Sequence, residues 1–415
     1  MMQPGRGRAM IFVLPVLAFI TAGAHADDWT RWRGPRANGV SNETHWNPQA
    51  LKKSNVAWQA EVGFGHSAVA VQGNRLYTMG NKTIDGVEND IVSCLDTQTG
   101  KTVWEYAFRC PDGGEDPGPG STPVLDGDRL YTLSREGHLF CLNAQDGSVI
   151  WKRHVVGEGL ADKRSWGFSS SPVIFGEAVV FGINTAGLAF DKKTGATLWN
   201  SDKGECGFST PVPFAWQGQT VALILAKRKL KAVDPATGKE RFSQQVGWGD
   251  ADPIPMGDKL FLEGQSARLM DFSTAEPKDI WDNKDLSFQF QSGVVVGDYF
   301  YGWGKIDWDA RTEAFYCIDM RDGALKWSKN FEMWGACAAA GDKILVVTGN
   351  GHVHVLEASP QGWSPLASAD VVPMADNSQI AHERRHCFCW TNPVLANGKL
   401  YIRNNHGTLV CVNMQ

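Results

Sequence analysis

The fold of this 415-residue chain is decided by one stretch, STPVLDGDRLYTLSREGHLFCLNAQDGSVIWK (Ser121–Lys152). It contains four apolar runs rich in Val, Leu, Tyr and Phe, and turn residues such as Gly127-Asp128 and Asp146-Gly147 separate them. Runs of about five such residues bounded by Gly, Asp or Asn are typical of β-strands. The stretch therefore predicts a small antiparallel sheet of four strands.

The same unit recurs along the chain, and an aromatic residue four positions after a T-G or D-G glycine marks its period. The marker residues are Trp104, Trp151, Trp199, Phe242 and Trp327, while Trp281 keeps the place without the turn and Trp58 precedes the first unit. Successive spacings from Trp58 are 46, 47, 48, 43, 39 and 46 residues. Four-stranded units at this spacing are the signature of a β-propeller.

The eighth unit lacks a fourth strand before the chain ends at Gln415. A spare strand with the marker tryptophan, Asn55–Val62, stands at the other end. We therefore expect an eight-bladed ring closed by strands from both ends of the chain, which leaves no open sheet edge. An open solenoid or two β-sandwiches would not explain this complementarity. The expected divisions are a signal peptide (1–26), a lead-in segment (27–54) and the propeller (55–415).

The first 26 residues predict export. Arg6 and Arg8 precede the apolar run AMIFVLPVLAFITAGA and the A-x-A pattern that ends at Ala26, as in a cleaved secretory signal. The run is short for a span of about 20 apolar residues, no later run is longer, and no cysteine for lipid attachment precedes Cys94. We expect a periplasmic or extracellular protein without a membrane span.

Charge excludes one class of partner. Removal of Arg6 and Arg8 takes the formal net charge from −5 to −7, and the chain has no basic block. Nucleic acid is therefore excluded, because neutralising phosphates requires clustered Lys and Arg.

The repeat resembles a known family. The segments VSCLDTQTGKTVW (Val92–Trp104), CLNAQDGSVIW (Cys141–Trp151) and AFDKKTGATLW (Ala189–Trp199) are similar to the pyrroloquinoline-quinone (PQQ) repeat with its tryptophan-docking motif. The opening DWTRWRGPRANGVS (Asp28–Ser41) resembles the lead-in of secreted PQQ-binding-like β-propeller repeat proteins. The resemblance covers Asp27–Gln415 and implies the fold. It leaves function open, because the repeat occurs in quinoprotein dehydrogenases and in the scaffold lipoprotein of the outer-membrane β-barrel assembly machinery.

The recurring tryptophans are expected to be structural. A tryptophan beside a T-G turn packs against the next blade, and burying such a ring contributes about 2–3 kcal/mol. This docking role is expected for Trp58, Trp104, Trp151, Trp199, Trp281 and Trp327.

A short segment of aromatic, Gly, Ser or Thr, and Pro precedes the inner strand of most units, as in WGFSSSP (Trp166–Pro172), and we call it the phrase. In a four-stranded meander the phrase and the loop between strands two and three emerge on one face, the phrase face. The long insertions, residues 81–90, 109–118, 304–313 and 369–387, all fall there. Long loops gathered on one side of a rigid scaffold are a common place for binding.

The variable phrase positions are expected to line the rim of a central funnel. They are His66, Trp166, Phe168, Phe208, Trp248, Asp250, Asp252, Gln289, Gln291, Trp334, Trp390 and Asn392. Aromatics with a few amides and carboxylates suit a planar or sugar-like ligand. The same residues would also fill a plugged channel, so both interpretations stay open.

Nine cysteines are unusual in an exported protein. Cys94, Cys141, Cys317 and Cys411 occupy a repeat position that accepts alanine elsewhere, so we expect inert core thiols. The other five, on the phrase face, are Cys110, Cys206, Cys337, Cys387 and Cys389. An oxidising compartment favours a disulfide between Cys337 and Cys387 or Cys389.

The segment HERRHCFC (His382–Cys389) also combines soft metal-ligand types, His382 and His386 beside two cysteines. A surface loop with a disulfide is the preferred interpretation, and no metal site is assigned.

Two functions follow from the resemblance. The preferred one is a monomeric, non-catalytic scaffold without a cofactor, which binds a protein partner or small ligand through the phrase face. The alternative is a dehydrogenase of alcohols or sugars that uses PQQ and calcium, with Asp250 and Asp252 as calcium ligand and base. The sequence has neither the adjacent cysteine pair common in quinoprotein alcohol dehydrogenases nor a C-x-x-C-H haem motif.

Overall fold

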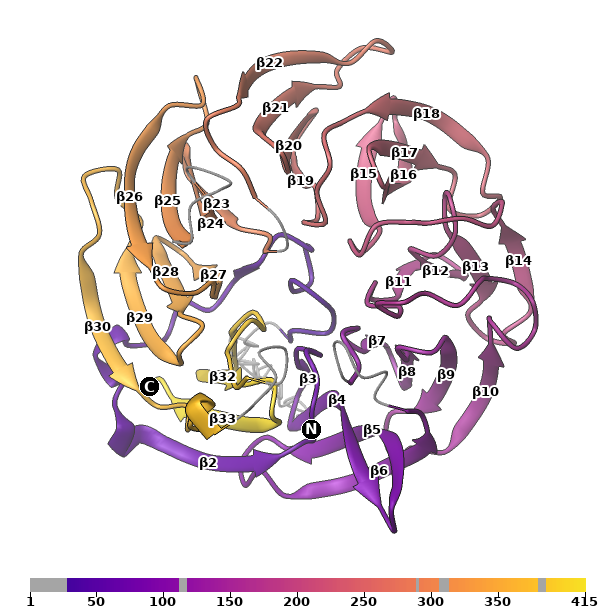
Figure 1. Ribbon diagram of the computed structural model, residues 1–415, viewed down its shortest axis with the longest axis horizontal. Coiled ribbons are helices and arrows are strands. Elements are labelled where there is room, and N and C mark those ends of the chain that lie inside the picture. Colours follow the sequence, from indigo (N-terminus) through magenta and orange to yellow (C-terminus); the bar gives the residue numbers. More distant parts are fainter. Residues whose placement is uncertain (1–27, 112–117, 289–290, 306–312, 380–385) are drawn as a thin grey trace, which may run out of the picture.

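The computed structural model describes residues 28–111, 118–288, 291–305, 313–379 and 386–415. They form eight antiparallel sheets arranged as blades around a central axis (Figure 1). Seven sheets have four strands, and the short β1 (Val40–Ser41) adds a fifth, parallel strand to the other. The predicted all-β, eight-bladed propeller is confirmed. Among the described residues no helix has the length and apolarity of a transmembrane span.

Each blade runs from an inner strand at the axis to an outer strand at the rim. Blade 1 consists of β3 (Ala70–Gln72), β4 (Arg75–Ile84), β5 (Val87–Asp96) and β6 (Thr102–Arg109), and blade 2 of β7 (Val124–Asp126), β8 (Arg129–Leu133), β9 (His138–Asn143) and β10 (Val149–His154). Blade 3 consists of β11 (Val173–Phe175), β12 (Ala178–Phe181), β13 (Leu188–Asp191) and β14 (Thr197–Asn200), and blade 4 of β15 (Val212–Trp216), β16 (Gln219–Ala226), β17 (Lys229–Val233) and β18 (Glu240–Gln245).

Blades 5 to 8 continue the ring in the same order, and the described residues also form three short 3-10 helices. Blade 5 consists of β19 (Ile254–Met256), β20 (Lys259–Glu263), β21 (Ala267–Asp271) and β22 (Lys278–Asn283), and blade 6 of β23 (Val294–Val296), β24 (Tyr299–Gly304), β25 (Glu313–Asp319) and β26 (Leu325–Phe331). Blade 7 consists of β27 (Ala336–Ala340), β28 (Lys343–Val347), β29 (His352–Glu357) and β30 (Pro365–Asp370), and blade 8 of β31 (Val394–Ala396), β32 (Lys399–Arg403), β33 (Thr408–Asn413) and β2 (Val56–Glu61). The helices are η1 (Pro48–Ala50), η2 (Lys53–Asn55) and η3 (Asn377–Gln379).

The marker tryptophans join each blade to the next. Each indole Nε1 donates a hydrogen bond of 2.9–3.0 Å to a carbonyl of the following blade, as Trp104 does to Ala144. The ring of Trp104 lies on Gly147, where a Cβ would come within 2.6 Å of it, and Gly147 has a φ of +74°. The T-G or D-G turn therefore needs glycine both for its backbone and for the tryptophan of the preceding blade.

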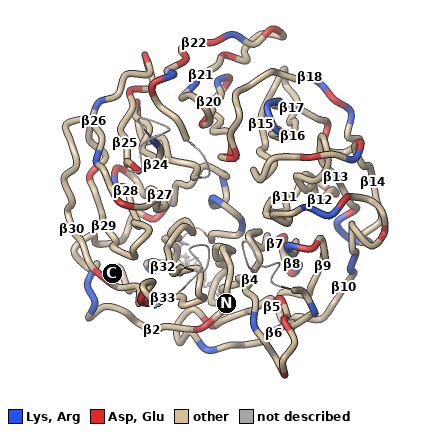
Figure 2. Tube along the Cα trace, in the orientation of Figure 1, with Lys and Arg blue, Asp and Glu red and all other residues tan. Residues whose placement is uncertain are grey.

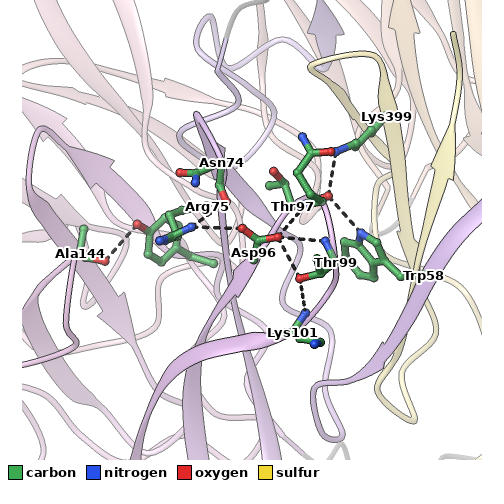
Figure 3. A network of polar contacts seen from close by, with 11 residues as sticks. Trp58, Asn74, Arg75, Asp96, Thr97, Thr99, Lys101, Ala144 and Lys399 are labelled. Carbon is green, nitrogen blue, oxygen red and sulfur yellow. Dashed lines mark hydrogen bonds and ion pairs between the residues drawn. The ribbon is translucent and has the colours of Figure 1, made fainter.

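The expected closure is confirmed. β2 pairs antiparallel with β33, and Trp58 lies opposite Cys411. Figure 3 shows the adjoining seam between blades 8 and 1, where Trp58 Nε1 and Lys399 Nζ both donate to the carbonyl of Thr97. Within the same turn, Asp96 accepts from Thr99 N at 2.9 Å and holds the carbonyl in place.

A buried arginine strengthens this seam on its inner side. Arg403, at the end of β32, is 1% exposed and donates to the carbonyls of Gly63, Gly65, Ser67 and Met79 at 2.8–3.0 Å. Charged donors make stronger hydrogen bonds than neutral ones. One side chain of the last blade thus fixes the connection into blade 1.

The lead-in segment crosses the middle of the ring (Figure 1). The carbonyls of Trp29 and Thr30 accept from Val71 N and Leu125 N of blades 1 and 2. Farther along, Arg33 Nη1 donates to the carbonyl of Ser292 before blade 6 at 2.8 Å, and β1 pairs with β27 of blade 7. The lead-in, predicted only as a preceding segment, therefore runs between the inner strands at the middle of the ring.

Candidate functional site

The phrases form a hydrogen-bonded chain around the axis. Two residues before each inner strand of blades 1 to 5, the backbone N–H of the phrase donates to a side-chain oxygen at the same position in the next blade. The links are Ala68 N to Thr122, Thr122 N to Ser171, Ser171 N to Thr210, Thr210 N to Asp252 and Asp252 N to Ser292, at 2.7–3.1 Å. The short polar residues of the phrase are therefore needed for blade-to-blade contact.

Asp252 and Asp250 belong to this architecture. Asp252 accepts from Thr210 N through Oδ1 and from Trp32 Nε1 through Oδ2, at 2.7 and 2.6 Å. Asp250 Oδ1 accepts from Phe208 N at 3.3 Å. Both carboxylates are buried, and burial raises the pKa of each. The two residues proposed for calcium binding and base chemistry thus have their oxygens directed at backbone and indole donors.

Four aromatic residues on the phrase face form what we call the rim cluster: His66, Trp334, Phe388 and Trp390. Trp390 stacks on Phe388 and His66, with ring centroids 4.3 and 5.9 Å apart, and meets the edge of Trp334 at 6.5 Å. These residues precede the inner strands of blades 1, 7 and 8, so the cluster spans three blades. The rings of His66, Trp334 and Trp390 are partly exposed.

Two amides hold the backbone under the rim cluster. Gln291 Nε2 donates to the carbonyl of Trp390 at 2.9 Å and so reaches from blade 6 to blade 8. Asn392 is buried, and its Nδ2 donates to the carbonyl of Cys337 at 2.8 Å. Asn392, predicted as a binding residue, therefore positions the cluster from below.

Cations flank the aromatic rings. Lys305 Nζ lies 5.3 Å from the Trp334 ring centroid and 3.4 Å from Glu313, while Arg164 covers the Phe208 ring at 4.7 Å. Burial raises the pKa of Glu313 to about 7, against the opposing effect of Lys305. Sequence reasoning missed these three charged residues and Phe388. The spacing of Phe388 and Trp390, two apart in an extended phrase, was the available signal for Phe388.

Of the remaining predicted rim residues, Trp166 and Phe168 precede the inner strand of blade 3, and Trp248 precedes that of blade 5. Trp166 is 43% exposed, and Trp248 is partly exposed beside Gln265, whose backbone N donates to its carbonyl. The prediction for Phe168 was wrong, because its ring is buried in the core between blades 2 and 3 and cannot reach a ligand. Gln289 lies outside the described residues.

The predicted disulfide is also wrong. All nine cysteines are buried free thiols. Cys337 Sγ contacts the carbonyl of Tyr301 and Cys389 Sγ contacts Met374 Sδ, both at 3.8 Å, so the two sulfurs point to different neighbours. Burial raises the pKa of Cys337 to about 12, which keeps this thiol protonated and unreactive.

The described residues also give no support to a metal site in the segment His382–Cys389. His382 lies outside them, and within the described ranges no group of three or more His, Cys, Asp or Glu residues is arranged to hold an ion.

Comparison with known proteins places these features in a family context. A family model described as outer membrane protein assembly factor BamB matches residues 88–329. Curated relatives include the outer membrane protein assembly factor BamB of Shewanella oneidensis, 22% identical over 88% of this chain and 90% of that protein. The Escherichia coli protein of the same name is 23% identical over 64% of this chain and 79% of that protein.

Solved structures share the fold at low identity. BamB from Moraxella catarrhalis is 17% identical with a TM-score of 0.59, over 86% of this chain and 96% of that chain. A europium-containing methanol dehydrogenase is 13% identical with a TM-score of 0.68, over 91% and 89%. The quinohemoprotein alcohol dehydrogenase from Comamonas testosteroni is 13% identical with a TM-score of 0.67, over 94% and 80%.

Proposed function

Because this chain belongs to the family described as outer membrane protein assembly factor BamB, we propose that it is a non-catalytic propeller that binds a protein partner. The phrase face is the proposed binding surface, and the protein acts as an exported monomer whose signal peptide is cleaved near Ala26. The proposed contact residues are the accessible ring side chains of the predicted rim, His66, Trp166, Phe208, Trp248, Trp334 and Trp390.

The observation that carries this proposal is the rim cluster with its flanking cation. Tryptophan is one of the residue types that dominate binding energy in protein interfaces, and the two tryptophans of the rim cluster are partly exposed. Trp390 Nε1 is buried and has no acceptor among the described residues, so the exposed part of this ring offers a partner an apolar surface. Lys305 beside Trp334 favours a partner surface that carries carboxylates.

The proposal is tested by photo-crosslinking in cells. A photoreactive residue is placed at Trp166 on the phrase face, and at Leu198 on the outer strand β14 as the matched exposed control. We expect a discrete crosslinked protein from position 166 that disappears when Trp334 and Trp390 are replaced by Ala. Equal crosslinking from both positions, or a product insensitive to the double substitution, would reject the phrase face as the binding surface.

A role like that suggested by the relatives' name is tested separately. In a strain lacking the gene, the amount of folded outer-membrane protein is measured after complementation with the wild-type chain or the Trp334/Trp390 double variant. We expect only the wild-type chain to restore it. Full restoration by the double variant, or no loss on deletion, would contradict an assembly role.

The alternative, a PQQ- and calcium-dependent dehydrogenase, fits this chain poorly. The fold resembles solved dehydrogenases, but both oxygens of Asp252 and one of Asp250 accept hydrogen bonds within the ring, and the lead-in crosses the middle of the ring. Incubation with PQQ and calcium, followed by dye reduction with alcohols or sugars, separates the two functions. Dye reduction that depends on all three additions would establish the dehydrogenase and refute the non-catalytic assignment.

A further inference from the structure

We propose that Arg31, at the centre of the ring, binds a small oxyanion, and that a carboxylate group is the preferred ligand. Arg31 lies where the lead-in crosses the channel. The residue before it, Thr30, is held by Leu125 N of blade 2, and the residue after it, Trp32, is held by Asp252 of blade 5. Figure 2 shows Lys/Arg segments of the lead-in at the centre of the ring. Arg31 is therefore flanked by a backbone contact to blade 2 at Thr30 and by a side-chain contact to the start of blade 5 at Trp32.

The guanidinium of Arg31 has unused donors. Its Nε and Nη2 atoms are buried and donate to no acceptor among the described residues. The neighbouring Arg33 differs, because it donates to the carbonyls of Ser292 and Gly293 at 2.8 and 2.7 Å. A buried charged donor without an acceptor costs free energy, and such groups are normally paired. The described residues thus provide acceptors for Arg33 but none for Nε and Nη2 of Arg31.

The charges around Arg31 do not balance. Asp252 attracts Arg31 electrostatically, but its two oxygens accept from Thr210 N and Trp32 Nε1. Glu263, beside Arg33, accepts from Gly293 N, and burial raises its pKa to about 8. Burial raises the pKa of Asp252 as well, so both carboxyl groups of this cluster favour the neutral form more than an exposed carboxyl group does. A bound anion would supply negative charge to Arg31.

The geometry of the open donors selects an oxyanion. Nε and Nη2 form one edge of the planar guanidinium and direct two parallel N–H groups outward. This edge matches the two oxygens of a carboxylate in a bidentate pair, and phosphate or sulfate can bind in the same way. Chloride offers a single acceptor point and satisfies the edge less well.

The test compares the full exported chain with Arg31→Gln by thermal unfolding at constant ionic strength in chloride, with acetate or inorganic phosphate added. We expect the midpoint of the wild type to rise saturably with acetate, because a ligand of the folded state stabilises it. Arg31→Gln should unfold at a higher midpoint than the wild type in chloride alone, since it removes an unpaired buried charge. It should bind acetate at least about tenfold more weakly.

Two further variants make the result specific. Arg36→Gln, an exposed arginine of the same lead-in that bonds Asn42, should respond to acetate as the wild type does. Arg31→Lys keeps the charge without the two-pronged edge and should bind acetate more weakly than the wild type. An acetate response that is equal in wild type and Arg31→Gln, or absent in both, would overturn the proposal, whatever partner the phrase face binds.

The carboxylate could belong to a free small acid or to the end of a polypeptide. A tripeptide with a free C-terminus and its C-terminal amide separate these sources. Binding of acetate without the tripeptide indicates a small acid, while binding of the free tripeptide but not its amide indicates a chain terminus. Each result requires loss in Arg31→Gln to support the proposal. Equal binding of the tripeptide and its amide would contradict carboxylate recognition.

Discussion

Trp32 Nε1 donates a 2.6 Å hydrogen bond to Asp252 Oδ2 across 220 residues of sequence. The same carboxylate accepts from Thr210 N, so one side chain connects the lead-in, the end of blade 3 into blade 4, and the start of blade 5. Asp252, which the sequence suggests as a calcium ligand or base, thus joins three segments of the chain.

Asp252→Ala should lower the free energy of unfolding by about 3–5 kcal/mol, because it leaves buried donors and the nearby Arg33 without their carboxylate. Urea unfolding measures the loss. Asp258→Ala, in the exposed turn before β20, is the matched control and should change stability by less than about 0.5 kcal/mol. Equal effects of the two substitutions would show that Asp252 does not have this role.

Deletions of the N-terminal segment should act in two steps. Removing residues 27–54 takes away the lead-in and should lower the unfolding midpoint, while removing residues 27–62 also takes away β2 and should lower it sharply further. The second loss reflects an eighth blade left with three strands. Calorimetry of both proteins provides the measurement, and an unchanged midpoint for the longer deletion would argue against closure by β2.

Replacement of the rim tryptophans should separate stability from binding. Trp390→Ala removes three ring contacts, each worth about 0.5–1.5 kcal/mol, so a moderate loss is expected. Trp248→Ala, at a partly exposed ring outside the rim cluster, should cost less. Trp390→Phe keeps a stacking ring and serves as the control. If the Trp248/Trp390 double Ala variant keeps its crosslinked partner, the rim assignment is incorrect.

Glu263 should make stability depend on pH. Its pKa is raised to about 8 in the folded state from an ordinary 4.5, so between these values the folded protein holds a proton that the unfolded chain has released. Stability contributed by this group is complete below about pH 4.5 and is lost as the pH rises to about 8. The free energy of unfolding in urea is measured at each pH for the wild type and for Glu263→Gln, and the difference between the two values isolates the effect. A difference that stays constant across this pH range would refute the prediction.

All nine thiols should be inaccessible in the folded protein. Ellman's reagent should detect none at neutral pH and nine after denaturation without reductant, because every cysteine is buried and unpaired. Intact mass before and after alkylation under denaturing conditions gives an independent count. A mass corresponding to seven alkylated cysteines would restore a disulfide to the protein.

The sequence predicts the ring well because its evidence is repeated. The spacing of Trp104, Trp151 and Trp199 repeats the same pattern in several units, so the prediction does not depend on any one of them. The three-stranded last unit together with Asn55–Val62 determines the closure. Turn glycines such as Gly147 follow from the same repeat.

The site is less predictable because it depends on single side-chain directions. Neighbouring inner strands brought Cys337 and Cys389 into the same region, but their sulfurs face different neighbours. Phe168 occupies a phrase position like Phe208, yet its ring turns into the core. The lead-in has no repeat, so nothing in its sequence specifies that Arg31 and Trp32 cross the axis.

The seam at Arg403 has a consequence for how the protein is made. Arg403 and its acceptor Gly63 are 340 residues apart, so the segment around Gly63 cannot reach its final partners until β32 has been synthesised. Contacts between such distant parts of a chain slow folding, because a long loop must close before they form. The growing chain therefore carries an unpaired β2 and an unfilled seam until β32 and β33 have been synthesised. A chain stopped before β32 would remain an open arc exposed to proteolysis and to other chains.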